Sequence, residues 1–67
     1  MTPRQQQVFD YIKSFIEAKG FSPTANEIVA SLGIKHRSQA HTIIDALINK
    51  GALVREYGKR RSLQVAA

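Results

Sequence analysis

The sequence contains no cysteine, so neither a disulfide framework nor a zinc site with thiolate ligands is possible. No apolar run approaches the roughly 18 residues that a membrane span needs, and the first residues do not form a secretory signal. The chain has 67 residues, and a chain of this size is expected to form one small domain, residues 1–67, with little room for an enclosed substrate pocket. These absences favour a cytoplasmic protein over a secreted or membrane protein.

Acidic residues are also few. The chain has five of them against ten lysines and arginines, for a formal net charge of +5. Residues 1–34 hold three cations and three anions, whereas residues 35–67 hold seven cations and two anions. The whole positive excess therefore lies in the second half. This asymmetry indicates a polyanionic partner, and the alternative is a charge excess that only keeps the domain in solution.

Two capping patterns predict the first two helices. Thr-Pro-Arg-Gln at residues 2–5 supplies an N-cap, a proline suited to the first helical position and a glutamine that completes a capping box. A helix over residues 3–19 follows. Thr-Ala-Asn-Glu at residues 24–27 repeats the pattern and predicts a second, shorter helix to about Leu32. A glycine follows each helix and can act as its C-cap. Phe21, in the connector between the helices, is expected to lie in the core.

Residues 38–50 predict a third helix with an unusual polar face. Its apolar stripe has helical spacing and consists of Ala40, Ile43, Ile44, Leu47 and Ile48. Away from this stripe, the amino-terminal part carries Ser38, Gln39, His41 and Thr42. Ser38 can also cap the helix. Together with the second helix and the turn at residues 35–37, this segment has the helix-turn-helix arrangement, although generic helical hairpins share the same outline.

The last part of the chain changes to a β pattern. Residues 52–57 are β-prone, residues 62–65 alternate polar with apolar side chains, and residues 58–61 supply a glycine turn with three cations. Leu53, Leu63 and Val65 are expected to face the helices. The sequence therefore predicts a mainly α (α+β) fold, a three-helix winged helix-turn-helix with a C-terminal two-stranded β-hairpin as its wing.

This arrangement favours binding of double-stranded DNA, because a major groove admits an α-helix and displays hydrogen-bonding groups on its base edges. Gln39 can bond adenine through two hydrogen bonds, Thr42 can meet a thymine methyl group, and His41 can donate to guanine. Asp45, one turn beyond His41, would repel phosphate, so the helix is expected to insert by its amino end. Contacts with phosphates or through the wing are expected from Lys35, Arg37, Lys59, Arg60 and Arg61.

Other interpretations of the same residues remain open but are less favoured. The polar face of the third helix can be an ordinary solvated face, and the basic hairpin tip can serve to keep the hairpin edge soluble. Lys50 can contact phosphate or complement the carboxyl end of its helix. His36 and His41 are five residues apart, a poor spacing for chelation, so no metal site is expected. Ser38 beside two histidines lacks an orienting acid and a cleft, so neither an enzyme nor a cofactor is expected.

Three segments resemble a known family. TPRQQQVFDYI at residues 2–12, SPTANEIVASLGI at residues 22–34 and ALINKGALV at residues 46–54 are similar to the N-terminal DNA-binding domain of the LexA repressors of the bacterial SOS response. The resemblance runs without gaps from Thr2 to about Val65. It implies a winged helix-turn-helix whose third helix enters the major groove of a palindromic operator and represses transcription until DNA damage triggers self-cleavage.

The resemblance also implies which positions contact bases, although their identities differ here. The usual family segment is approximately Arg-Ser-Pro-Asn-Ala-Ala-Glu-Glu-His-Leu, and the corresponding run here is Lys-His-Arg-Ser-Gln-Ala-His-Thr-Ile-Ile at residues 35–44. The positions implied to contact bases are His36, Ser38, Gln39, His41 and Thr42. Because the two glutamates of the family are replaced by His41 and Thr42, the operator is expected to differ from the usual SOS operator.

The family's C-terminal self-cleaving part, which carries most of its dimerisation and damage sensing, does not occur in this sequence. The chain is therefore either the DNA-binding piece of a longer repressor or a separate relative that is regulated differently. We expect two copies to bind one palindromic operator and the free chain to be a monomer or weak dimer. The alternative function is a winged-helix protein-interaction module that binds an acidic protein partner.

Overall fold

The computed structural model describes residues 1–55 and 63–66, and its first two helices occupy the predicted positions. Helix α1 (Pro3–Lys19) begins at a complete capping box, in which Thr2 Oγ1 accepts from the Gln5 N–H at 3.2 Å and Gln5 Oε1 accepts from the Thr2 N–H at 3.2 Å. Helix α2 (Ala25–Leu32) begins at a second box, formed by Thr24 and Glu27 with distances of 3.2 and 2.8 Å. Each box satisfies two free N–H groups, out of three at the amino end of α1, where Pro3 has no N–H, and out of four at that of α2.

Helix α3 (Arg37–Asn49) begins without a side-chain cap. Its N-cap residue is His36, in extended conformation, and Ser38 already lies inside the helix, so the prediction that Ser38 caps this helix was wrong. Without a cap hydrogen bond, α3 depends on the packing of its apolar stripe. Ala40, Ile44 and Leu47 are all buried against the rest of the domain.

The chain ends in a two-stranded antiparallel sheet. Strand β1 (Leu53–Arg55) pairs with β2 (Leu63–Val65), with Leu53 opposite Val65 and Arg55 opposite Leu63. Leu53 and Leu63 are buried and Val65 packs against the core, so the prediction that these three residues face the helices is confirmed. The predicted basic turn at residues 58–61 lies outside the described residues.

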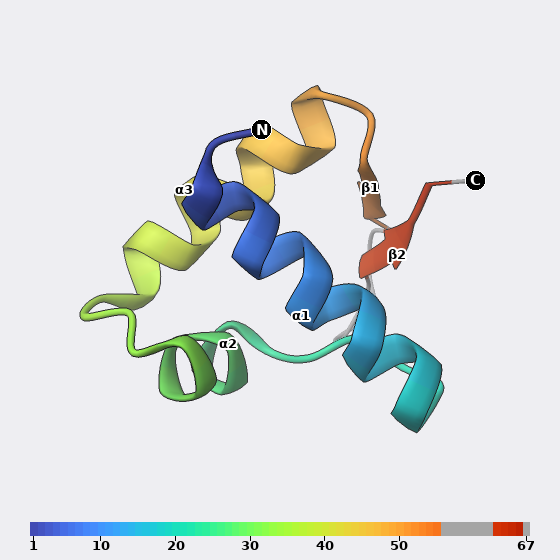
Figure 1. Cartoon of the computed structure of the whole chain (residues 1–67), viewed down its shortest axis with the longest axis horizontal. Helices are drawn as coiled ribbons and strands as arrows, with labels where there is room; N and C mark the ends of the chain where they lie inside the picture. The colour runs from blue at the N-terminus through green and yellow to red at the C-terminus, as the bar shows by residue number, and fades with distance from the viewer. Residues whose placement is uncertain (56–62, 67) are drawn as a thin grey trace.

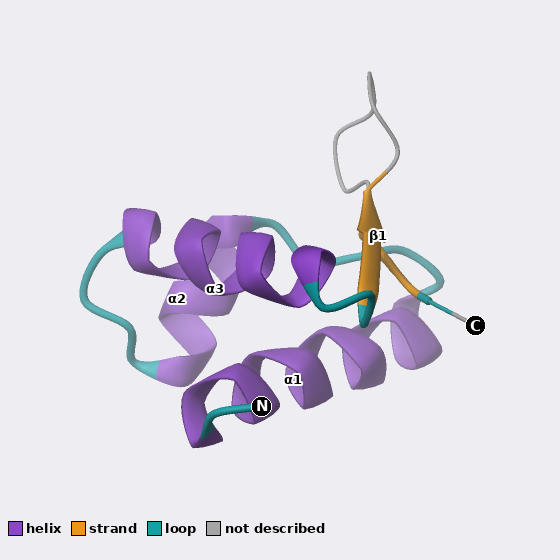
Figure 2. Ribbon diagram, turned by 90° about the horizontal axis from the view of Figure 1, so that it is seen from above, coloured by secondary structure: helices purple, strands orange, loops and turns teal. Residues whose placement is uncertain are grey.

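The helices and the sheet enclose one small core. In Figure 1, α1 crosses the molecule between α2 and α3, and the sheet lies to one side of the helices. Figure 2 shows α1 running beneath α3, with β1 beside the last turn of α3. Buried side chains from every element meet in this core: Val8, Ile12, Ile28, Ile34, Ala40, Ile44, Leu47, Leu53 and Leu63. Three helices followed by an antiparallel hairpin confirm the predicted mainly α, winged helix-turn-helix fold.

In the connector between α1 and α2, the buried residues do not include the one that the sequence predicts. Phe21 is 46% exposed and packs its ring edge-on against Phe15, with ring centroids 5.8 Å apart, so its predicted place in the core was wrong. Ser22 is buried instead, at 1% exposure. Pro23 is buried as well, so the connector enters the core directly after Phe21 and leaves the Phe21 ring outside it, against Phe15.

Ser22 connects the helical part of the domain to the wing. Its Oγ accepts a hydrogen bond from the backbone N–H of Leu63 at 3.2 Å, in a buried position. Water cannot replace a buried partner of this kind without cost. The hydroxyl therefore holds the first residue of β2 against the connector between α1 and α2.

No helix among residues 1–55 and 63–66 combines the length and the apolar character that a membrane span requires.

We predict that Ser22→Ala lowers the free energy of unfolding by about 1–3 kcal/mol, because the buried Leu63 N–H loses its acceptor. Urea denaturation followed by circular dichroism measures the change. Ser14→Ala, at an exposed position of α1, is the matched control and should change stability by less than about 0.5 kcal/mol. Equal stability of the two variants would show that the hydroxyl does not hold the wing.

Candidate nucleic-acid interface

The predicted base-contacting residues all lie on the surface at the amino end of α3. Helix α2 ends at Gly33, which has the left-handed conformation that glycine adopts most readily (φ 66°). A short turn then leads into α3, so the two helices form the predicted helix-turn-helix. The exposed residues of this region include the whole predicted set, His36, Ser38, Gln39, His41 and Thr42.

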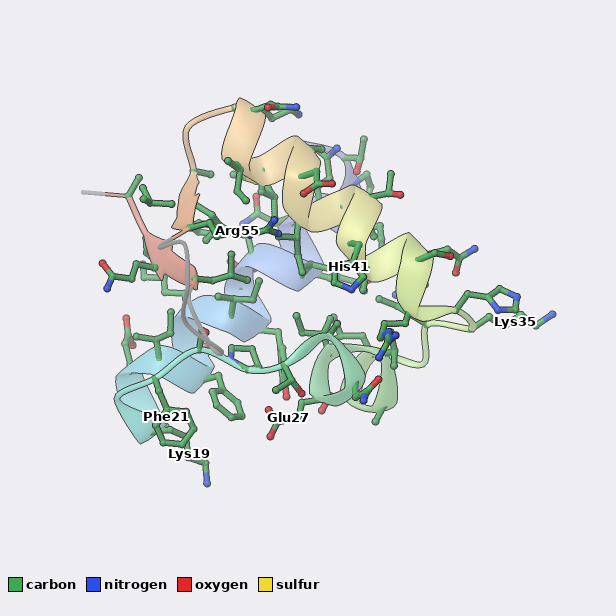
Figure 3. The ribbon with its side chains drawn as sticks, turned by 180° about the vertical axis from the view of Figure 1, so that it is seen from behind. Lys19, Phe21, Glu27, Lys35, His41 and Arg55 are labelled. Atoms are coloured by element: carbon green, nitrogen blue, oxygen red, sulfur yellow. The ribbon has the colours of Figure 1, made fainter. Side chains whose placement is uncertain are left out.

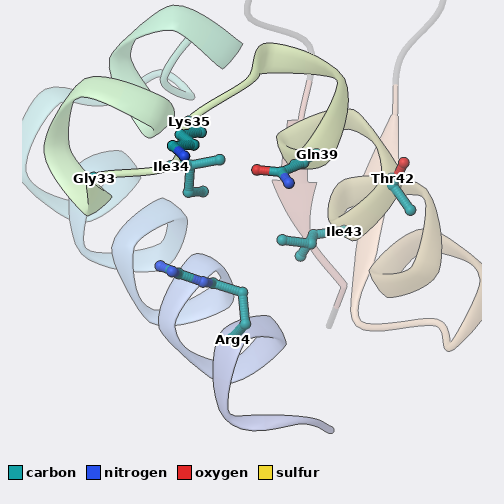
Figure 4. A pocket seen from close by; sticks show the side chains of 7 residues that line it. All are labelled: Arg4, Gly33, Ile34, Lys35, Gln39, Thr42 and Ile43. Atoms are coloured by element: carbon teal, nitrogen blue, oxygen red, sulfur yellow. The ribbon is translucent and has the colours of Figure 1, made fainter.

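These side chains do not share one narrow face. At about 100° per residue, Gln39 and His41 project from α3 roughly 160° apart. Ser38 and Thr42 lie between them, on the side opposite the buried stripe. Figure 4 shows Gln39 on the flank of α3 that faces α1, whereas Figure 3 shows His41 on the flank toward β1. The interface therefore has a central ridge and two flanks, each next to a different part of the fold.

Thr42 has a more restricted hydrogen-bonding role than its sequence position indicates. Its hydroxyl donates to the Ser38 carbonyl oxygen at 3.0 Å, a bond that threonine commonly makes within a helix. The proton of the hydroxyl is therefore already used. A base can still meet the methyl group or donate to the oxygen.

Asp45 has a cationic partner that sequence analysis did not identify. Its Oδ1 lies 3.5 Å from Nη2 of Arg55, which projects from β1 toward α3. The Asp45 side chain is 61% exposed and the Arg55 side chain 36% exposed, so solvent screens the pair and its contribution to stability is small. Its effect on the local field matters more, because Arg55 offsets the negative charge of Asp45 beside the predicted base-contacting residues.

The predicted phosphate-binding cations fall into two groups. Lys35 and Arg37 are exposed at the turn before α3 and make no hydrogen bond or ion pair with the described residues. Both are thus available for an external anion. Lys59, Arg60 and Arg61 lie outside the described residues. Lys50, for which two roles were open, donates from Nζ to Gln5 Oε1 at 2.8 Å and so connects the end of α3 to the start of α1.

A cleft of about 620 Å³ lies between α1 and the Gln39 flank of α3. Figure 4 shows the residues that line it: Arg4, Gly33, Ile34, Lys35, Gln39, Thr42 and Ile43. Arg4 had been interpreted only as part of a helix start. It approaches the cleft because its Nη1 donates to the Leu32 carbonyl oxygen at 3.3 Å, a contact 28 residues away that no local pattern could reveal.

The described residues contain no group of side chains suited to bind a metal ion. Their histidines, aspartates and glutamates nowhere gather in a group of three or more that can hold an ion. His36 and His41 are both exposed. What this surface offers is a set of hydrogen-bond donors and acceptors flanked by cations, which is the chemistry of nucleic-acid recognition.

Comparison with known proteins identifies the family. The family described as "LexA DNA binding domain" matches residues 1–62. The chain is 45% identical over 65 residues to the LexA repressor of Oleidesulfovibrio alaskensis, covering 97% of this chain and 31% of the relative. It is 40% identical over 65 residues to the LexA repressor of Dechloromonas aromatica, covering 97% of this chain and 32% of that relative. It is 36% identical over 66 residues to the LexA repressor of an Azoarcus species, covering 98% of this chain and 33% of that relative.

The chain thus spans about a third of the length of the curated relatives it matches. The matched region is a DNA-binding domain and not an enzymatic one, which agrees with the expectation from the sequence. The resemblance in the three segments quoted above is confirmed. This chain belongs to the LexA DNA-binding domain family.

Proposed function

We propose that residues 1–67 form one domain that binds double-stranded DNA sequence-specifically in the bacterial cytoplasm and represses transcription from an operator of the SOS type or a related one. The observation that carries this proposal is the exposed, polar amino-terminal part of α3, in a chain of the LexA DNA-binding domain family. The relatives named above are repressors. Repression follows if such a domain occupies an operator and blocks transcription there.

Base recognition is assigned to the ridge and flanks of α3. Gln39 presents an amide that can pair with adenine through two hydrogen bonds, and His41 presents a ring nitrogen that can donate to guanine. Thr42 offers its methyl group to thymine, since its hydroxyl proton is engaged by the Ser38 carbonyl. Ser38 and His36, next to the amino end of the helix, complete the set. Insertion by this end keeps Asp45 away from the floor of the groove.

Phosphate contacts are assigned to cations around this surface. Lys35 and Arg37 have no partners among the described residues and stand at the amino end of α3. Lys59, Arg60 and Arg61 are assigned to the wing, where they can bind phosphates or enter an adjacent minor groove. We further propose that two copies bind a palindromic operator, because two-fold symmetry of a DNA site mirrors that of the bound protein.

The salt dependence of binding tests the proposed function. If each copy neutralises about five phosphates, log K should fall with log salt concentration with a slope of about −4 to −5. Fluorescence anisotropy with a labelled duplex, over salt from about 50 to 200 mM, measures this slope. Binding that does not change with salt would contradict the proposal and would favour a module that binds an acidic protein instead.

The preferred operator and the role of Gln39 can be tested together. Selection from a random duplex pool should enrich a palindrome. On that site we expect Gln39→Ala to cost roughly 1–3 kcal/mol of binding free energy and to relax specificity at one base pair. Gln6→Ala, on the exposed side of α1, is the control. Replacing Lys59, Arg60 and Arg61 together by alanine should instead weaken binding to all duplexes alike. A Gln39→Ala variant that behaves like the wild type on every duplex would refute this placement of the recognition surface.

Removal of the Asp45 carboxylate should strengthen DNA binding. Asp45→Asn eliminates a charge that repels phosphate and releases Arg55 from its ion pair, so we expect affinity for all duplexes to rise roughly two- to threefold. Glu17→Gln, an exposed neutralisation on α1, provides the same change in net charge away from α3. If both variants gain affinity equally, net charge explains the gain and the local role of Asp45 is rejected.

A further inference from the structure

The cleft beside Gln39 is positively charged and has an apolar floor. Arg4 approaches it from α1 and Lys35 from the turn before α3, while Ile34 and Ile43 contribute apolar surface. No carboxylate of residues 1–55 or 63–66 lines it. The two cations and the Gln39 amide are complementary to an anion that has several acceptor oxygens.

Arg4 is held in place by two hydrogen bonds made by the same nitrogen. Its Nη1 donates to the Leu32 carbonyl oxygen at 3.3 Å and to Gln7 Oε1 at 3.2 Å. The guanidinium group is planar and carries five N–H groups in fixed directions. Nη2 and Nε make no hydrogen bond or ion pair with the described residues. These bonds direct the Arg4 guanidinium group toward the end of α2, while most of its donors remain available.

The dimensions of DNA determine what this cleft would face. A major groove is about 12 Å wide, and a helix with its side chains is about 10–12 Å across. The two flanks of an inserted α3 must therefore lie close to the two sugar-phosphate backbones. One flank carries His41 and adjoins β1. The other carries Gln39 and adjoins Arg4 and Lys35.

We propose that Arg4 and Lys35 together bind one backbone phosphate of the DNA strand on the Gln39 side of the groove. This inference rests on the proposed function and adds a residue of α1 to the DNA-binding surface. Because Arg4 also bonds the last carbonyl of α2, one guanidinium group would connect the helix-turn-helix to the DNA backbone. That contact fixes how far α3 slides along the groove, and it positions Gln39 opposite its base pair.

The first test compares Arg4→Gln with Lys13→Gln. Lys13 is exposed on α1, and nine residues of helix place it about 180° from Arg4, so the two variants lose the same charge on opposite faces. We expect Arg4→Gln to weaken binding to every duplex about tenfold and to reduce the magnitude of the salt slope by about 0.9. Lys13→Gln should leave affinity and slope close to those of the wild type. An unchanged salt slope for Arg4→Gln overturns the inference.

The second test separates a direct contact from an effect on folding. Single phosphates of the selected duplex are replaced by uncharged methylphosphonates, one at a time, and each duplex is titrated with wild type and Arg4→Gln. One position on the strand beside Gln39 should weaken the wild type about tenfold and have no effect on the variant. If the effects of the two changes simply multiply at every position, Arg4 does not touch a phosphate. Thermal unfolding of both proteins identifies any loss of stability.

The outcomes also distinguish this inference from the proposed function. A wild type without salt-sensitive duplex binding overturns the proposed function, and the inference with it. A wild type that binds its operator as proposed, together with an Arg4→Gln variant of equal affinity and equal slope, overturns the inference alone.

Discussion

Packing of the apolar stripe of α3 into the core that the described residues form is the constraint on which the rest of the structure depends. The helix has no side-chain cap at its amino end, so burial of Ala40, Ile44 and Leu47 must hold it. Those three residues contact a core to which α1, α2 and both strands contribute. The core therefore fixes the rotation of α3 about its axis, and with it the direction of the polar residues opposite the stripe.

Polar contacts on the two sides of α3 complement this packing. On one side, Lys50 bonds Gln5 at the start of α1, and Arg4 bonds the end of α2. On the other side, Arg55 of β1 pairs with Asp45. Each contact is exposed and contributes little to stability. Their common effect is to place cationic side chains beside both flanks of the helix, where the two backbones of a bound duplex would lie.

Local chemistry made much of this fold predictable, and long-range contacts account for what was missed. Two capping boxes predict α1 and α2 because each involves residues three positions apart. Phe21 was misplaced because hydrophobicity alone does not tell which residues of a short connector reach the core: Ser22 and Pro23 are buried and Phe21 is not. Arg4 and Arg55 were overlooked because their partners lie 28 and 10 residues away. The predicted cap at Ser38 failed because the N-cap residue is His36, two positions earlier, and its side chain makes no cap hydrogen bond.

The residues that hold the fold together and the residues exposed on α3 are different ones, which explains how His41 and Thr42 can replace other residues. The segments that resemble the family supply caps, core residues and the glycine turn, all of which act through packing within the domain. His41 and Thr42 are exposed and contact no core residue through a hydrogen bond, so their exchange for the glutamates usual in the family costs the fold little. It removes two negative charges from the surface assigned to DNA and leaves a ring nitrogen and a methyl group there. We infer that operator sequence can change in this family without change to the core that orients α3.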